Sequence, residues 1–357
     1  MNNNNDIEIA SLNSKKIAIN IKEKLNNQFK FINKNKIRII CVIATILFPF
    51  SILYIIYLSL KLKKLSNNKE NISEKNELLD MCYKSRGFYY SRIRRLENSK
   101  LVTIQEKLNY LLVHESPDIK SKIADKILLH DYSIKKLGID ICVPIIKIYD
   151  NANDIKLEDL PDKFVLKCNH GSGMNILCEN KKEFDLNLAK KKLNEWKNIN
   201  YGLKFNEFQY LNIDRKIFAE QYLKKDVEDY KIYCFHGECK FIRVQKHLEG
   251  LPYKLNNYYD LNWKLTEIET GVPGCKRIPD IIYEKPKNFD LMLKYAEKLS
   301  EDFAFVRVDF YNINGKIYLG EMTFSPSNMT FKLKDRQQSI ELGKLIYLDK
   351  IKKSFLV

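Results

Sequence analysis

The chain has 357 residues, of which 45% are hydrophobic, and its formal net charge is +16. This composition excludes global disorder, and the length suffices for two compact domains or for one large α/β unit with an appendage. The eight cysteines form no CxxC pair and no zinc-type cluster with histidine, so we expect neither a disulfide framework nor a structural zinc site.

The first 80 residues divide into three stretches of different composition. Residues 1–36 are polar and rich in Asn and Lys, as in a flexible or interfacial tail. Residues 37–60 are almost entirely apolar, with a charge only at Arg38, and are long enough to span a membrane as a helix. Residues 61–80 form a polar linker, and we expect the folded catalytic region to occupy residues 81–357.

Pro49 lies in the middle of the apolar segment, where it could kink a spanning helix or turn a re-entrant hairpin. Lysines flank both ends of the segment, so the positive-inside rule does not set the orientation of a spanning helix. A hairpin would place both basic flanks in the cytoplasm and so fits the charges better. A cleaved signal peptide is disfavoured because the segment lies far from the start and lacks a small-residue cleavage site. We expect attachment to the inner or cytoplasmic membrane, with the catalytic region in the cytoplasm.

The rest of the chain alternates between helical and strand patterns. Residues 101–138 have apolar residues at helical spacing, with a break at Ser116-Pro117 and an end at Gly138. Further helices are predicted at about 184–197 and 288–300. Strand patterns, several of them paired across glycine turns, occur in ICVPIIKIY, KFVLKCN, MNILCEN, KIFAEQYL, DYKIYCFHGECKFIRVQKH and FAFVRVDFYNINGKIYLGEMTF. Helices interleaved with antiparallel hairpins predict an α+β fold.

Three groups of residues carry candidate chemistry. The first is Lys167, which is followed within six residues by the turn His170-Gly171-Ser172-Gly173. Glycines let backbone N–H groups approach phosphate oxygens closely, and the lysine adds positive charge. The same pattern also suits a plain structural hairpin turn. It is not a Walker loop, which needs GKS or GKT at the start of a helix.

The second group is Arg307, Asp309 and Glu321. Arg307 and Asp309 alternate on one face of a predicted strand, and Glu321 lies on the partner strand beyond Asn314-Gly315. Two carboxylates on adjacent antiparallel strands can hold Mg²⁺ against ATP phosphates. A cross-strand ion pair is the structural alternative, but a charged group inside such apolar strands is costly unless it is used.

The third group is AEQYL, residues 219–223, followed by Asp229 and Lys231. The backbone at a strand end can bind the edge of an adenine, and an acidic residue can bind ribose hydroxyls. This pattern alone is not specific.

In this order the three groups resemble the ATP-grasp fold. Upstream, ADK at residues 124–126 and KKLGIDICVP are similar to the DK…GI…P signature of ATP-grasp ligases. The segments LPDKFVLKCNHGSGMNI, DYKIYCFHGECKFIRV and FAFVRVDFYNINGKIYLGEMTFSP most closely resemble the teichuronopeptide-biosynthesis (TupA-like) ATP-grasp family. The resemblance covers about residues 101–348 and leaves out the N-terminal hundred residues.

The resemblance implies a role for each matching residue. By this resemblance, Lys126 and Lys167 contact the phosphates, and residues 170–173 form the flap over the phosphates. The residues expected to contact adenine and ribose are Glu220, Gln221, Tyr222, Leu223 and Asp229. Lys231 lies near the triphosphate, Arg307 stabilises the transferring phosphoryl group, and Asp309 and Glu321 bind Mg²⁺.

One position departs from the common ATP-grasp pattern. Many of these enzymes carry asparagine two residues after the metal-binding glutamate, and here that position is Thr323. A hydroxyl is a weaker Mg²⁺ ligand, which puts the second metal site in question. His170 and His236 are candidate bases, although each precedes a glycine in a turn.

The implied function is ATP-dependent ligation of a carboxylate to an amine through an acylphosphate, with ATP and Mg²⁺ as cofactors. The family context implies an acidic or lipid-linked glycan or amino-acid substrate of cell-surface polysaccharide synthesis. Five basic residues could bind a polyanionic acceptor or could be solvated surface charges: Lys240, Arg243, Lys246, Lys276 and Arg277.

Two other classes of function remain open. A glycosyltransferase of capsule synthesis is disfavoured because there are no paired Rossmann halves and no clear DxD motif. The net positive charge is compatible with nucleic acid, with anionic lipid, or with codon bias alone. Nucleic-acid binding is not expected, because no RRM, KH or HTH signature occurs.

Overall fold

The structure, a computed structural model, describes residues 101–115, 117–205, 207–224, 227–247, 252–271, 274–329 and 333–351. The tail, apolar segment and linker predicted for residues 1–80 lie outside these residues, as does the predicted start of the folded region at residue 81. None of the helices in the described ranges is both long and apolar enough to cross a membrane.

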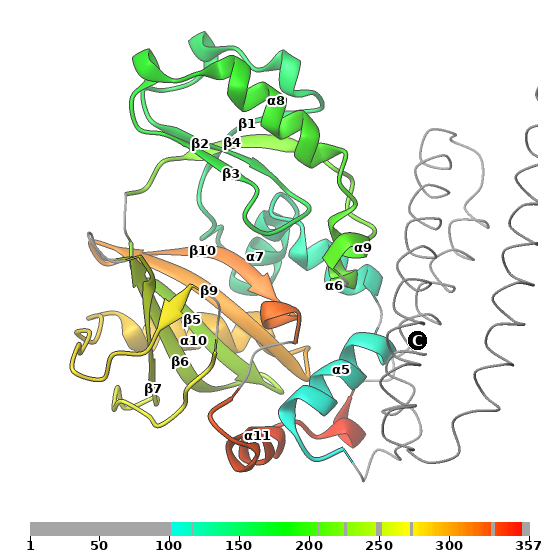
Figure 1. Cartoon of the computed structure of the whole chain (residues 1–357), viewed down its shortest axis with the longest axis vertical. Coiled ribbons are helices and arrows are strands. Elements are labelled where there is room, and N and C mark those ends of the chain that lie inside the picture. Colours follow the sequence, from blue (N-terminus) through cyan, green and yellow to red (C-terminus); the bar gives the residue numbers. More distant parts are fainter. Residues whose placement is uncertain are drawn as a thin grey trace, which may run out of the picture. The chain divides into compact units, whose positions relative to one another are not determined.

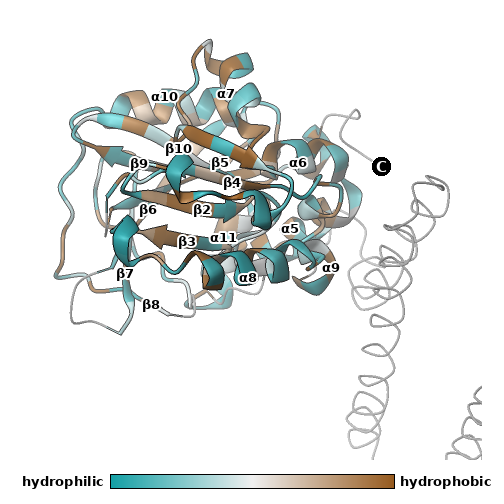
Figure 2. Ribbon diagram, turned by 90° about the horizontal axis from the view of Figure 1, so that it is seen from above, coloured by the Kyte–Doolittle hydropathy of each residue, from teal (hydrophilic) through white to brown (hydrophobic). Residues whose placement is uncertain are grey.

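A four-stranded antiparallel sheet, the small sheet, has the strand order β1-β4-β2-β3 (Figure 1). Its strands are β1 (Ile145–Tyr149), β2 (Phe164–Cys168), β3 (Asn175–Cys178) and β4 (Ile217–Gln221). Helix α8 (Leu186–Lys197) covers one face, where Leu193 packs with Phe164 and Ile217 in a fully buried cluster. In Figure 2 the strands β2 and β3 are largely brown, while the outer turns of α8 are teal.

A six-stranded sheet, the large sheet, has the order β10-β9-β5-β6-β7-β8. Its strands are β5 (Asp229–Phe235), β6 (Glu238–His247), β7 (Lys254–Tyr259), β8 (Cys275–Lys276), β9 (Phe305–Ile313) and β10 (Lys316–Thr323). The remaining α-helices are α5 (Ile104–His114), α6 (Pro117–Ala124), α7 (Leu129–Leu137), α9 (Tyr201–Phe205), α10 (Phe289–Ser300) and α11 (Arg336–Gly343). Short 3₁₀ turns include η5 (Phe208–Tyr210) and η6 (Pro326–Met329).

The two faces of the large sheet differ in character because successive side chains of a strand point to opposite faces. Val306 and Val308 lie on the apolar face, packed with Met292 and Leu299 of α10. Each such fully buried aliphatic side chain contributes about 1.5–3 kcal/mol. The opposite face, which we call the polar face, carries the charged residues of β5, β6, β9 and β10. The α+β arrangement and the antiparallel hairpins agree with the sequence prediction.

One predicted helix is divided in two. The pattern after Pro117 predicts a helix that continues to Gly138, whereas the structure ends α6 at Ala124 and starts α7 at Leu129. The carboxylate of Asp125 accepts hydrogen bonds from the backbone N–H groups of the next turn, 2.8 Å from the N of Ile127, and so competes with the helix. The predicted end at Gly138 is confirmed, with a left-handed φ of 75°.

Candidate functional site

A network of charged side chains crosses β9 and β10 on the polar face. Arg307 Nε and Nη2 donate to the two carboxylate oxygens of Asp309, at 2.6 Å each. The same Nη2 donates to Glu321 Oε1 at 3.2 Å and to Thr323 Oγ1 at 3.0 Å. Glu321 stands directly opposite Asp309 in the strand register, and Thr323 stands opposite Arg307. The structure therefore brings together the four residues of these two strands that were predicted from the sequence to belong to the site: Arg307, Asp309, Glu321 and Thr323.

A β-bulge at Gly320 places Glu321 on the polar face. The register shifts between Leu319 and Glu321, so that Leu319 and Met322 both join the apolar core. Without the extra residue, Leu319 and Glu321 would share a face. A Cβ at Gly320 would lie 2.9 Å from a ring carbon of Tyr311, so the close approach at this bulge requires glycine.

Lys231 on β5 extends the network to the third strand. Its Nζ donates to Asp309 Oδ2 at 2.8 Å and also pairs with Asp229. Burial alone raises the pKa of the Asp309 carboxyl, but Arg307 and Lys231 together lower that pKa well below its ordinary value. Asp309 is therefore ionised at neutral pH and is neutralised by two cations while only 3% exposed.

Two lysines approach this network from the other side of the site. Lys167 on β2 forms an ion pair with Glu220 on β4. Lys126 lies at the break between α6 and α7 and donates to the carbonyl oxygen of Gly171 at 2.7 Å. Burial lowers the pKa of Lys126, Lys167 lowers it further, and the carboxylates of Glu321 and Glu220 act in the opposite direction. Lys126 thus lies within electrostatic reach of carboxylates on both sheets.

The turn after β2 is exposed at its tip. Ser172 and Gly173 are exposed, and Gly173 has a left-handed φ of 73°. His170 is buried instead, with Nε2 3.2 Å from the carbonyl oxygen of Trp196, and burial lowers its pKa to about 4. His236 accepts a hydrogen bond from the backbone N of Tyr347 at 2.9 Å. These contacts favour a packing role for both histidines over the role of a base.

The predicted nucleotide-binding segment lies where β4 ends. Gln221 donates its backbone N–H to the carbonyl oxygen of Pro144 at 2.9 Å, and its side chain is exposed. Tyr222 donates its hydroxyl to Glu179 at 2.8 Å, and Leu223 is half-buried. Farther along, Asp229 pairs with Lys231, while Asp229 Oδ1 is buried without a hydrogen-bond partner among the described residues.

One acidic residue near the network was not predicted from the sequence. Glu207 Oε2 accepts hydrogen bonds from Ser325 Oγ and from Gln209 Nε2, each at 3.0 Å. The pKa of Glu207 is raised to about 7, mainly by burial, and the nearby charge of Glu321 acts in the same direction. Glu207 belongs to no sequence motif and follows a short helix. Only its proximity to Glu321 in the folded chain identifies it as a candidate site residue.

Comparison with known proteins identifies the family. The family described as TupA-like ATPgrasp matches residues 106–347. The chain belongs to this family. No curated protein matches the chain.

Several solved structures are similar to this chain. D-alanine–D-alanine ligase from Bacillus anthracis, complexed with ATP, has 16% identity and a TM-score of 0.35 over 63% of this chain and 64% of that one. L-amino acid ligase from Bacillus licheniformis has 13% identity and a TM-score of 0.34 over 56% and 40%. Biotin carboxylase from Campylobacter jejuni has 15% identity and a TM-score of 0.35 over 66% and 49%. The match spans less than two thirds of each of these proteins.

The ATP-grasp residues present here fit a magnesium ion. Asp309, Glu321 and Thr323 offer oxygen atoms from two adjacent strands, and hard oxygen donors are the ligands that Mg²⁺ prefers. Thr323 Oγ1 already accepts from Arg307 and lies 3.3 Å from Glu321 Oε1, so it supports the carboxylates as well as offering an oxygen.

The five basic residues predicted near the site differ in their surroundings. Lys240 pairs with Glu238 at 2.5 Å, and Lys246 pairs with Glu228. Lys276 is exposed and lies over the ring of Tyr253, and Arg277 Nη2 donates to the carbonyl oxygen of Thr266 at 2.7 Å. Arg243 alone among the five is buried.

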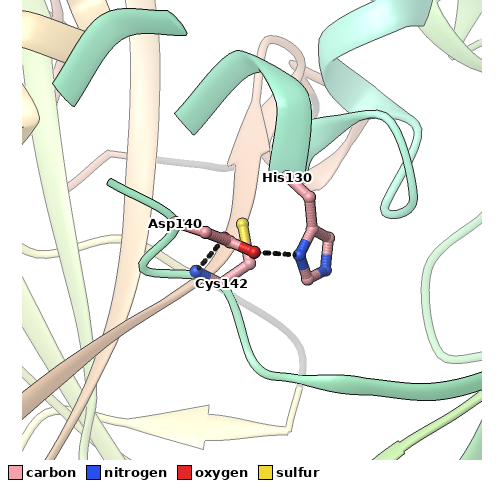
Figure 3. A group of neighbouring side chains, drawn as sticks. All are labelled: His130, Asp140 and Cys142. Atoms are coloured by element: carbon pink, nitrogen blue, oxygen red, sulfur yellow. Dashed lines mark hydrogen bonds and ion pairs between the residues drawn. The ribbon is translucent and has the colours of Figure 1, made fainter. Parts of the chain in front are cut away.

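A second polar group lies on the helix side of the large sheet (Figure 3). His130 Nδ1 is 2.7 Å from Asp140 Oδ2, and the backbone N of Cys142 donates to Asp140 Oδ1 at 2.9 Å. The three residues line a pocket of about 590 Å³ together with α10 and the β9–β10 turn. Burial and the neighbouring Asp140 raise the pKa of the Cys142 thiol well above its usual range, so the thiol is protonated and unreactive.

Proposed function

We propose that this protein is an ATP-dependent carboxylate–amine ligase. The observation that carries the proposal is the convergence of Lys126 and Lys167 with Glu321 and Asp309 at one site. Cations that can bind phosphate oxygens and carboxylates that can bind Mg²⁺ are the two halves of a nucleotide-triphosphate site. Membership of the ATP-grasp family supports the same assignment.

In the proposed reaction a substrate carboxylate oxygen attacks the γ-phosphorus of ATP, and the bond to ADP breaks. The resulting acylphosphate is attacked by an amine, which loses a proton as phosphate leaves. Lys126 and Lys167 hold the phosphates in this scheme. The Gly171–Gly173 turn, whose Gly171 carbonyl oxygen accepts a hydrogen bond from Lys126, forms the flap over them. Mg²⁺ held by Asp309 and Glu321 would neutralise charge on the phosphates.

Arg307 and Lys231 stabilise the negative charge that develops on the transferring phosphoryl group. Both are held in place by Asp309, which fixes their positions before substrate binds. Preorganised charges in a buried site stabilise the transition state more strongly than the same charges would in water. No side chain needs to act as a covalent nucleophile in this scheme.

We further propose that the substrate belongs to cell-surface polysaccharide or teichuronopeptide-like synthesis, and that residues 37–60 hold the protein at the cytoplasmic membrane. The second proposal rests on the sequence of that segment, which carries one charge, at its edge. Membrane attachment fits a lipid-linked acceptor. A glycosyltransferase of capsule synthesis is the rival function, and the experiment below distinguishes them.

The test uses the full chain with ATP, Mg²⁺, hydroxylamine as a general amine, and L-glutamate or D-glucuronate as acids. The proposal predicts acid-dependent formation of ADP and of the corresponding hydroxamate, since hydroxylamine traps an acylphosphate. Arg307→Met should abolish hydroxamate formation. Hydrolysis of a nucleotide-sugar by a protein that does not bind ATP would overturn the ligase assignment in favour of the glycosyltransferase.

A further inference from the structure

Arg243 lies on β6, one strand beyond the charged network. In the strand register Lys231 stands opposite Asp309 on one side and opposite Arg243 on the other. On the far side of Arg243, the next residue in this row is Tyr258 of β7. Residues directly opposite on adjacent strands have neighbouring side chains on one face. Arg243 therefore belongs to the same polar face as Asp309, at a distance of two strand spacings, or about 10 Å.

The guanidinium of Arg243 is buried without a counter-ion. Arg243 is 4% exposed and forms no ion pair with any residue in the described ranges. Its side chain is hydrogen-bonded to Tyr258, but its Nε has no hydrogen-bond partner among those residues. The nearby carboxylate of Asp309 is already held by Arg307 and Lys231. Removing a charge from water without pairing it is costly, so such a residue indicates a partner that arrives from outside the chain.

A second buried polar atom near this row also lacks a partner. Asn256 is 1% exposed, and its Oδ1 accepts no hydrogen bond in the part of the chain that the structure describes. Asn256 stands opposite Gln245, two residues along β6 from Arg243 and so on the same face. The polar face thus offers an unpaired donor and an unpaired acceptor on β6 and β7, beside the proposed phosphoryl-transfer site.

We propose that Arg243 binds a carboxylate of the substrate that is not the carboxylate being activated. The reacting carboxylate must lie at Arg307 and Lys231, whereas Arg243 is displaced toward β7. Asn256 Oδ1 accepts an N–H or O–H of the same molecule. The substrate class is accordingly a dicarboxylic or amino-dicarboxylic acid with a further donor group, and this inference rests on the proposed ligase function.

The test compares glutarate with butyrate, which carries the same three-carbon chain on one carboxylate and has a hydrogen in place of the second carboxylate. Binding to the full chain is measured by calorimetry in the presence of Mg²⁺ and a non-hydrolysable ATP analogue. We expect glutarate to bind at least tenfold more tightly than butyrate. Arg243→Gln should remove this difference and leave the affinity for the nucleotide unchanged. Lys240→Gln, a change in a half-buried residue on the same strand that already pairs with Glu238, should preserve the difference.

Equal affinities for the two acids in the wild-type protein, absence of glutarate binding, or a preference retained in Arg243→Gln would each overturn the inference. A wild-type protein that binds glutarate through Arg243 but does not bind the nucleotide would instead overturn the proposed function. Arg243→Met separates binding from a purely structural role. If Arg243 serves to bind a ligand, ligand-free Arg243→Met has the melting temperature of the wild type or a higher one. Glutarate then no longer raises the melting temperature of this variant. A lower melting temperature with glutarate stabilisation retained would contradict the inference.

Discussion

The guanidinium of Arg307 binds both carboxylate oxygens of Asp309, with Nε and Nη2 each 2.6 Å from an oxygen. Lys231 adds a third hydrogen bond to this carboxylate, and Asp309 is 3% exposed. Replacing Asp309 with Asn would leave two buried cations without their counter-charge. We expect Asp309→Asn to lower the free energy of unfolding by about 3–5 kcal/mol, measured by urea denaturation.

Asp290→Asn is the matched control, because Asp290 is exposed and lies 3.5 Å from Lys285. Exposed ion pairs contribute about 0–1 kcal/mol, so this variant should unfold almost as the wild type does. Equal stability of the two variants would show that the cations do not depend on Asp309.

The β-bulge at Gly320 is expected to be needed for Mg²⁺-dependent nucleotide binding. A Cβ at this position would lie 2.9 Å from the Tyr311 ring, and relief of that clash would move the strand that carries Glu321. We expect Gly320→Ala to weaken Mg²⁺-dependent nucleotide binding at least tenfold, measured by calorimetry. Gly138→Ala adds a Cβ that meets nothing within 4 Å but has a φ of 75°, so it should cost about 1 kcal/mol of stability and leave binding unchanged. Wild-type binding by Gly320→Ala would refute the role of the bulge.

The raised pKa of Glu207 should make the stability of the folded protein depend on pH. Its pKa is raised from 4.5 to about 7 in the folded protein, mainly by burial. The folded state therefore binds more protons than the unfolded state between these pH values, so this group makes stability fall as pH rises from about 4.5 to 7. Glu207→Gln should remove that slope and be more stable than the wild type above pH 7, by on the order of 2 kcal/mol.

Urea denaturation of the wild type and Glu207→Gln at pH 5 and pH 8 provides the measurement. A difference in stability that does not change between these two pH values would contradict the raised pKa. Glu179→Gln serves as a control, because Glu179 is exposed and accepts a hydrogen bond from Tyr222.

Local patterns predicted much of the fold and of the site. Alternation alone separated Arg307 and Asp309 from Val306 and Val308, because the strand period is two and one face is apolar. The same rule fails at Glu321, whose spacing from Leu319 would place both residues on one face. Only the bulge in three dimensions explains why one is in the core and the other is in the site.

Other features depend on partners that are distant in the sequence. The break at Asp125 uses a side chain that also accepts hydrogen bonds from Asn169, 44 residues later. Glu207 meets Ser325, which lies 118 residues away. The sequence does not distinguish the five basic residues near the site from one another. In the structure Lys240 and Lys246 each pair with a nearby carboxylate, whereas Arg243 is buried without such a partner among the described residues. Composition and periodicity do not contain this information.

The most direct test is calorimetric binding of ATP with Mg²⁺ to the full chain and to two variants, Lys167→Met and Glu321→Gln. The account predicts that the wild type binds ATP, that Lys167→Met weakens binding with or without Mg²⁺, and that Glu321→Gln removes only the gain in affinity that Mg²⁺ provides. Lys163→Met, a change in an exposed residue just before β2, should bind as the wild type does. A folded wild-type protein that binds no ATP, or ATP binding that neither variant alters, would contradict the account.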